Sequence, residues 1–215
     1  MRATLIPYPD SASSPIERIE VEFDFEGRPS ALVTFRLFGD TDRIAIHAPS
    51  ASVARAKARD QWRLGLFLIP KSLLRLPLPW RWMPAPTPVG RADGLWQHTC
   101  LEVFAARPDG CYAEFNLSPS NEWAAYFFDG YRDGMRPLKE ASVQVHAFER
   151  SDGELKLRAS VYWQGWMATA GLGFSAVIED VDGKKTYWAL AHPSDKPDFH
   201  HPDSFAIPMS TPENP

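Results

Sequence analysis

Residues 100–118 read CLEVFAARPDGCYAEFNLS, two runs of strand-forming residues on either side of a Pro-Asp-Gly turn. Pro and Asp suit a type I turn, and Gly suits the left-handed position that closes a three-residue hairpin loop. This loop sets a register in which Glu102 lies opposite Asn116 and Phe104 lies opposite Glu114. One face of the hairpin is then apolar and is predicted to lie in the core: Leu101, Val103, Ala105, Ala113, Phe115 and Leu117. The other face, extended back along the chain, is polar and aromatic: Trp96, His98, Cys100, Glu102, Phe104, Tyr112, Glu114, Asn116 and Ser118.

Alternating apolar and polar residues recur along the rest of the chain, as expected for half-buried strands. The alternating runs span residues 19–25, 33–37, 143–147, 155–161, 172–179 and 185–191. Asp152-Gly153 and Asp182-Gly183 separate the second and third pairs of runs, and Asp-Gly between strand-forming runs is a strong hairpin signal. Several hairpins at close spacing predict an all-β fold, an antiparallel β-sandwich of jelly-roll or immunoglobulin-like type.

One stretch, residues 50–89, interrupts this pattern. Residues 51–60 are rich in Ala, Arg and Lys and could form a short helix, and residues 64–69 could form a buried strand. Six prolines then surround Trp80 and Trp82, which excludes a regular element there. We therefore expect a short helical, Pro- and Trp-rich insertion that covers the sandwich, and not a second domain.

Length and composition are those of one globular domain over residues 1–215, with a frayed tail at residues 210–215. The formal net charge of −4 is the opposite of a phosphate-binding footprint, so we expect no nucleic-acid partner. No apolar run approaches the roughly 20 residues that cross a bilayer, and residues 1–15 lack the apolar stretch of a secretory signal. These features predict a cytoplasmic protein without a membrane partner. Cys100 and Cys111 lie at opposite ends of the hairpin without CxxC spacing, which predicts two free thiols and no zinc site.

The polar face of the hairpin is a candidate recognition surface for a sugar. An aromatic plane suits the apolar C–H face of a sugar ring, and carboxylates and amides suit neighbouring hydroxyl groups. The alternative is that this face is only the solvated side of an amphipathic hairpin. Trp96 and Phe104 favour recognition, because large aromatic side chains among carboxylates are uncommon on open solvent faces.

Several blocks of the sequence also resemble a known family. They read LWQHTCLEVF (95–104), EFNLSPS (114–120), WAAY (123–126), YR (131–132), YWALAHP (187–193) and KPDFH (196–200). Together they resemble the bacterial DOMON-like domain proteins, which are relatives of the type 9 carbohydrate-binding modules. The resemblance spans about residues 17–205 and implies a ligand-binding β-sandwich. The sequence departs from the family pattern at residues 50–89, where a short connection is expected.

The resemblance also implies a set of ligand contacts. Type 9 modules hold a terminal sugar between two Trp side chains, with a Glu six residues after the first, and Trp96 and Glu102 match that spacing. Trp188 and Trp123 are both candidates for the second Trp, and Arg132 is a polar partner by its place in the blocks. The full predicted ligand-binding set is Trp96, Glu102, Asn116, Glu114, Tyr112, Arg132 and Trp188. We therefore expect a non-catalytic module that binds a small ligand, most simply a sugar or sugar derivative.

Three other chemistries stay open at this stage. Glu102 and Glu114 could be an acid/base pair of a glycoside hydrolase, although a flat sheet face rarely shifts a carboxyl pKa enough. A haem-binding electron-transfer domain would use a Met, from among Met83, Met135, Met167 and Met209, with His98 or His146. Residues His192, Asp198, His200, His201 and Asp203 could hold a divalent metal ion, or could instead fix their loop by hydrogen bonds to backbone. No motif requires a cofactor, and a structural calcium ion has no clear place in the sequence.

Overall fold

The computed structural model of the protein describes residues 1–209, except for residues 10, 12–13, 26–28 and 48–89. The predicted insertion at residues 50–89, with its helix and buried strand, therefore lies outside the described residues, as does the predicted tail at residues 210–215. Within the described part of the chain, no helix has the length and apolar character that crossing a membrane requires.

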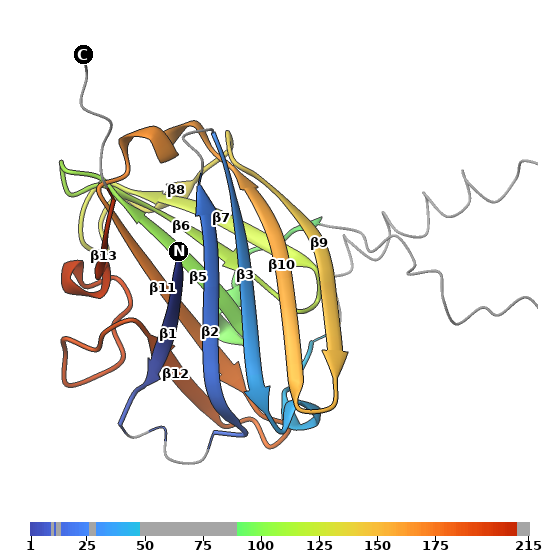
Figure 1. The fold of residues 1–215 in the computed structure, drawn as a ribbon. Coiled ribbons are helices and arrows are strands. Elements are labelled where there is room, and N and C mark those ends of the chain that lie inside the picture. Colours follow the sequence, from blue (N-terminus) through green and yellow to red (C-terminus); the bar gives the residue numbers. More distant parts are fainter. Residues whose placement is uncertain (10, 12–13, 26–28, 48–89, 210–215) are drawn as a thin grey trace, which may run out of the picture.

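The described residues form thirteen strands and four short 3-10 helices (Figure 1). The strands are β1 (Arg2–Pro7), β2 (Ile16–Phe25), β3 (Ser30–Gly39), β4 (Gly90–Arg91), β5 (Cys100–Ala106), β6 (Tyr112–Leu117), β7 (Glu122–Phe128), β8 (Arg136–Pro137), β9 (Ser142–Ser151), β10 (Glu154–Tyr162), β11 (Gly171–Glu179), β12 (Lys185–Ala189) and β13 (Ile207–Pro208). The 3-10 helices are η1 (Thr41–Arg43), η3 (Leu95–Gln97), η4 (Gln164–Ala168) and η5 (Pro202–Ser204).

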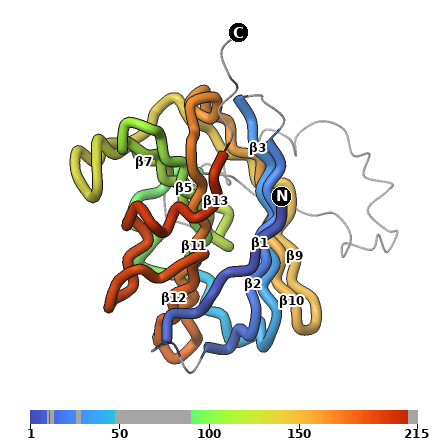
Figure 2. Tube along the Cα trace, turned by 60° about the vertical axis from the view of Figure 1, so that its left-hand side comes forward, coloured from blue at the N-terminus to red at the C-terminus, as the bar shows by residue number. Residues whose placement is uncertain are grey.

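The strands are arranged as two facing layers that share β1. One layer has the order β1-β2-β3-β10-β9, and the other has the order β4-β7-β6-β5-β11-β12. Because β1 pairs with β2 through Arg2 to Leu5 and with β12 through Ile6 and Pro7, the sheet curls from one layer into the other (Figure 2). The prediction of an all-β sandwich is confirmed. One short pair departs from the antiparallel pattern, because β4 runs parallel to β7.

The core lies between the two layers and is built largely from aromatic and branched side chains. Phe174 of β11 contacts Phe23 of β2 and Phe35 of β3, with ring centroids 5.6 and 6.3 Å apart. Trp166 of η4 stacks on Phe115 of β6 at 5.2 Å and closes one end of the core. Burying such side chains is the main stabilising contribution to a sandwich of this kind.

The predicted hairpins are confirmed where the structure describes them. In the β5–β6 hairpin, Glu102 pairs with Asn116 and Phe104 with Glu114, as the turn predicts. Gly110 has φ +85°, and the Arg107 amide donates to the Cys111 carbonyl across the loop at 2.9 Å. The β2–β3, β9–β10 and β11–β12 pairs also form antiparallel ladders. Both cysteines are free thiols, as predicted.

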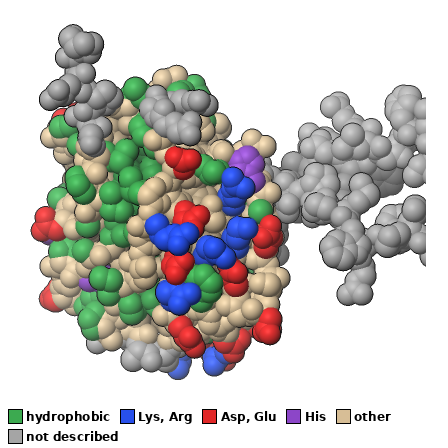
Figure 3. Space-filling view, in the orientation of Figure 1, with side chains coloured by type: hydrophobic (Ala, Val, Ile, Leu, Met, Phe, Trp, Pro, Cys, Tyr) green, Lys and Arg blue, Asp and Glu red, His purple; other side chains and the backbone are tan. Residues whose placement is uncertain are grey.

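The outer face of the β1-β2-β3-β10-β9 layer is solvated and charged. Basic and acidic side chains are interspersed across it, over β2, β3 and β10 (Figure 3). Arg36 pairs with Glu154 at 2.7 Å, and Lys156 pairs with Glu149 at 3.2 Å. Exposed pairs of this kind contribute little stability, and here they complete the alternation of apolar and polar residues along the strands.

Candidate ligand-binding pocket

A cavity of about 430 Å³ opens on the outer face of the other layer. Its lining comes from β5, β6, β7, β11 and β12, from η3, from the segment before β8, and from the loop after β12. The lining residues are Trp96, Glu102, Glu114, Phe128, Arg132, Met135, Val177, Tyr187, Pro197, Phe199 and His200. The cavity therefore lies on the polar hairpin face that the sequence singles out.

This hairpin face is covered, and the alternative of a simple solvated face is wrong. Glu102 and Glu114 are only 3% and 4% exposed. A second apolar cluster lies on this side of the sheet, where Phe104, Tyr112 and Phe128 pack with Phe205, which lies between η5 and β13. Covering the face removes water from the two carboxyl groups, which disfavours their ionised forms.

The carboxyl groups of Glu102 and Glu114 form a buried, interacting pair. Burial, and next the charge of Glu114, raise the pKa of Glu102 to about 8, although the Ser175 hydroxyl donates to its Oε2 at 2.6 Å. Burial raises the pKa of Glu114 to about 7, against the opposing effects of Asn116, whose Nδ2 donates at 2.6 Å, and of Arg132. Near neutral pH the pair therefore keeps at least one proton and offers both a hydrogen-bond donor and an acceptor. The expectation that a sheet face would not shift carboxyl pKa values is wrong here, because the face is covered.

Arg132 brings a fixed positive charge to the rim of the cavity. Its Nη2 lies 2.8 Å from Oδ1 of the buried Asp198, and Tyr131 donates its hydroxyl proton to the same carboxylate. Burial alone would raise the pKa of Asp198, but the hydrogen bonds from Tyr131 and Arg132 outweigh burial and lower it. Arg132 has φ +54°, and its amide donates to the Tyr112 hydroxyl at 3.1 Å. Both its backbone and its guanidinium are therefore held in place.

His200 closes the cavity as a neutral imidazole. Its Nδ1 lies 2.8 Å from the Tyr112 hydroxyl oxygen, and its Nε2 lies 3.9 Å from Oε2 of Glu114. Burial, together with the positive charge of Arg132, lowers the pKa of His200 to about 4. A neutral ring next to a carboxyl pair adds polar recognition without adding charge.

The structure brings four of the predicted ligand contacts to the cavity, namely Trp96, Glu102, Glu114 and Arg132. Trp96 arrives there from η3 and not from a strand, because β5 begins only at Cys100. The residue is 39% exposed, and its ring meets Tyr126 edge-on, with centroids 5.7 Å apart. Tyr126 thus supports one side of the Trp96 ring, which can serve as a platform on which a ligand stacks.

Three predicted contacts lie elsewhere. Asn116 and Tyr112 are buried behind the cavity, where they hold Glu114 and His200 and do not line the space. Trp188 is 2% exposed in the main core, and its Nε1 donates to the Thr186 hydroxyl at 3.2 Å. Trp188 therefore does not line the cavity, because its ring is buried in the core on the opposite face of the sheet.

The residues of the predicted metal loop after β12 make separate contacts and do not converge on one point. Asp198 and His200 face Arg132 and the cavity, whereas Nε2 of His192 lies 2.8 Å from the Ile6 carbonyl oxygen. Nδ1 of His201 accepts the Asp203 amide proton at 3.2 Å and caps η5. These five side chains are not grouped as metal ligands, whereas, among the described residues, His47, His98 and Glu179 each bring one possible ligand atom within 4.8 Å of the others.

Several lining residues had no signal in the sequence analysis. Phe199 and Tyr187 belong to blocks that resemble the DOMON-like family, but no role came with them. Phe128 and Val177 look like ordinary core residues in sequence, and Met135 was singled out only as a possible haem ligand. These residues border a cavity only because the segment that follows β12 packs over the sheet.

Comparison with known proteins bears on the fold. The chain shares its fold with a putative carbohydrate-binding protein from Bacteroides uniformis ATCC 8492. The TM-score with that crystal structure is 0.56 at 10% sequence identity, over 94% of this chain and 83% of the other. At this identity the similarity shows a common fold alone. No protein-family model matches the chain, and no curated protein matches it in sequence.

Proposed function

We propose that the cavity binds a small carbohydrate without catalysis. The observation that carries the proposal is the half-exposed Trp96 beside two buried carboxyl groups and a fixed guanidinium, all lining one cavity. The indole face suits the C–H face of a sugar ring, and Glu102, Glu114 and Arg132 suit its hydroxyl groups. Because the carboxyl pair keeps a proton near neutral pH, it can both donate to and accept from neighbouring hydroxyls.

The size of the cavity supports a short ligand. At about 430 Å³ it falls in the lower part of the roughly 300–1,000 Å³ range of small-molecule pockets. Phe199 and Tyr187 add apolar surface to the lining of the cavity. A monosaccharide, a disaccharide or a compact sugar derivative is the ligand class that this volume favours.

Glu102 and Glu114 lie close together on one sheet face. They are diagonal neighbours on the same face of one hairpin, with Cα atoms roughly 7–8 Å apart. Both carboxyl groups therefore reach a ligand in the cavity from the same side.

Two further findings support the proposal at a coarser level. The fold is shared with a protein described as a putative carbohydrate-binding protein. The resemblance to DOMON-like proteins and type 9 modules points to the same ligand class through Trp96 and Glu102, and that family assignment stays a prediction.

The experiment has two stages. A glycan array, including free mono- and disaccharides as competitors, identifies the sugar, and calorimetric titration then compares the wild type with Trp96→Ala. We expect a tenfold to hundredfold loss of affinity, since a stacking aromatic contributes on the order of 1–3 kcal/mol. Tyr162→Ala, which removes a similarly exposed aromatic from β10, is the matched control and should leave affinity unchanged. Absence of sugar binding, or equal affinity in both variants, would refute the proposal.

A further inference from the structure

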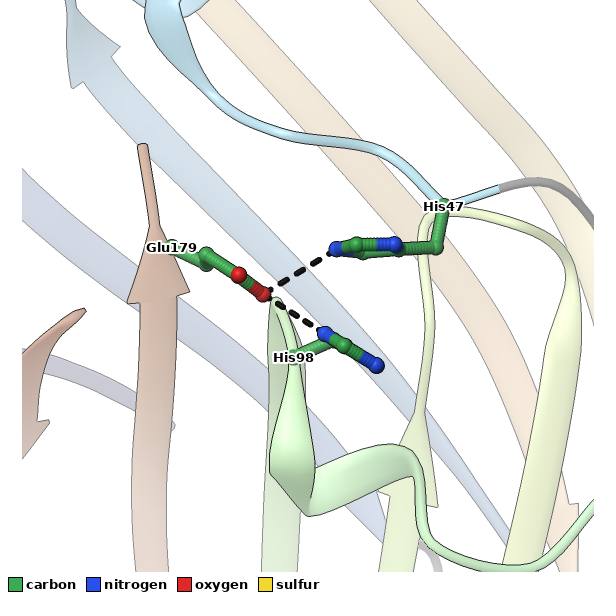
Figure 4. Close-up of side chains that lie close together, drawn as sticks. All are labelled: His47, His98 and Glu179. Atoms are coloured by element: carbon green, nitrogen blue, oxygen red, sulfur yellow. Dashed lines mark hydrogen bonds and ion pairs between the residues drawn. The ribbon is translucent and has the colours of Figure 1, made fainter. Parts of the chain in front are cut away.

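A second group of polar side chains lies outside the cavity, at the end of β11. Figure 4 shows His47, His98 and Glu179 pointing toward one another from three separate segments of the chain. Nε2 of His47 lies 3.1 Å from Oε2 of Glu179, and Nδ1 of His98 lies 2.7 Å from the same oxygen. The two imidazole rings lie 3.7 Å apart with an angle of 34° between their planes. One nitrogen or oxygen atom from each residue therefore lies within 4.8 Å of the other two.

The backbone under this group is held together by a buried threonine. The Thr99 hydroxyl donates to the Ala45 carbonyl at 2.9 Å and accepts the Glu179 amide proton at 3.1 Å. The Ala45 amide donates to the Glu179 carbonyl at 2.8 Å, so the three segments are hydrogen-bonded to one another. Thr99 is 2% exposed. The three side chains thus stand on a scaffold that fixes their relative positions, as ligand sites require.

The donor set and its geometry suit a transition-metal ion. Two imidazole nitrogens and one carboxylate oxygen are a common protein ligand set for zinc and its neighbours. Tetrahedral bonds of about 2.0–2.1 Å place ligand atoms about 3.3 Å apart. The 3.1 Å pair is already close to this spacing, and a small rotation of the half-exposed His98 ring opens the 2.7 Å pair.

We propose that His47, His98 and Glu179 bind one divalent transition-metal ion, with Zn²⁺ as the reference ion. Two imidazoles and one carboxylate leave a fourth coordination position for water or another ligand, because both rings are nearly half exposed. The ion joins the segment after η1 to the start of β5 and the end of β11. This site is separate from the cavity that is proposed to bind carbohydrate, because none of its three residues lines that cavity.

The test uses the full-length protein after chelation and dialysis. Calorimetric titration with Zn²⁺ should give one equivalent, and Co²⁺ should give the visible absorption of a nitrogen- and oxygen-ligated tetrahedral site. His47→Ala, His98→Ala and Glu179→Gln should each weaken Zn²⁺ binding more than about 100-fold, since even changes to groups that only support a ligand cost 10–100-fold. The two His variants should fold normally because both rings are half exposed.

His146→Ala is the matched control, because His146 lies on β9 and its Nε2 is 2.7 Å from the Ser160 hydroxyl, outside the group. It should bind Zn²⁺ like the wild type. The proposal is overturned if micromolar Zn²⁺ does not bind to the wild type. It is equally overturned if binding persists in His98→Ala and Glu179→Gln, which would place the ion elsewhere.

Discussion

Replacing Glu102 with Gln removes an ionisable group from the buried pair while keeping the shape of the side chain. The amide oxygen of Gln can still accept the Ser175 hydroxyl proton that Glu102 Oε2 accepts at 2.6 Å. The variant therefore isolates the cost of ionising this position, and it leaves the packing around Phe104 intact. The quantity that it changes is the pH dependence of the free energy of unfolding.

The sign and size of the effect follow from the raised pKa. Burial and the charge of Glu114 raise the pKa of Glu102 from 4.5 to about 8, so the folded protein keeps a proton that the unfolded chain releases. The retained proton stabilises the folded protein. Its contribution to the free energy of unfolding is fully present below about pH 4.5 and is lost as the pH rises through about 8. Between about pH 6.5 and 8.5 the wild type should lose about 2 kcal/mol through this group alone. His200 does not interfere, because its lowered pKa, about 4, affects stability only below about pH 6.5.

Urea denaturation at several pH values across this window measures the effect. From about pH 6.5 to 8.5 the free energy of unfolding should fall in both proteins. The fall should be about 2 kcal/mol smaller in Glu102→Gln than in the wild type. Glu149→Gln, which changes an exposed carboxyl on β9, is the control and should follow the wild type. Parallel curves for Glu102→Gln and the wild type would refute the reasoning, because they would mean that Glu102 is ionised throughout.

Three further outcomes are expected. Gly173→Ala should lower the free energy of unfolding by about 1–3 kcal/mol in urea denaturation, because the new Cβ would lie 2.7 Å from the Phe205 ring, and unchanged stability would contradict this packing. In a thiol-reagent assay Cys111 should react in the native protein and the fully buried Cys100 only after unfolding, and equal native rates would contradict their burial. Arg132→Lys should weaken sugar binding about tenfold in calorimetry, because Lys keeps the charge but cannot bridge the buried Asp198 and a ligand with one planar group, and unchanged affinity would exclude that role.

The hairpin register could be predicted because local chemistry determines it. The residues of the β5–β6 turn dictate the loop, and the loop dictates that Glu102 and Asn116 are opposite. The same alternation gave the wrong local structure at Trp96. The apolar and polar pattern continues there by coincidence, but Trp96 belongs to the 3-10 helix η3, whose preceding residue Gly94 has a left-handed backbone conformation. The strand β1 was not predicted at all, because only Leu5 of its six residues is buried and the apolar alternation is weak.

The cavity could be predicted only in part, because its cover comes from distant sequence. Loop residues such as Phe199 and His200 cover Glu114, which lies far from them along the chain, and no local pattern encodes that contact. Trp188 illustrates the reverse difficulty. Positions 187 and 188 are both aromatic, so periodicity does not say which side chain faces the core, and only the structure shows that Trp188 does.

The most direct test of carbohydrate binding at this cavity is a titration followed by the indole N–H signals of the Trp residues in two-dimensional NMR. The Trp96 signal is identified by its loss in Trp96→Ala, and the buried Trp166 and Trp188 serve as internal references. Addition of the sugar selected on the array should shift the Trp96 signal progressively to saturation while the Trp166 and Trp188 signals stay in place. A saturated sugar complex in which the Trp96 signal does not move would contradict binding at this cavity.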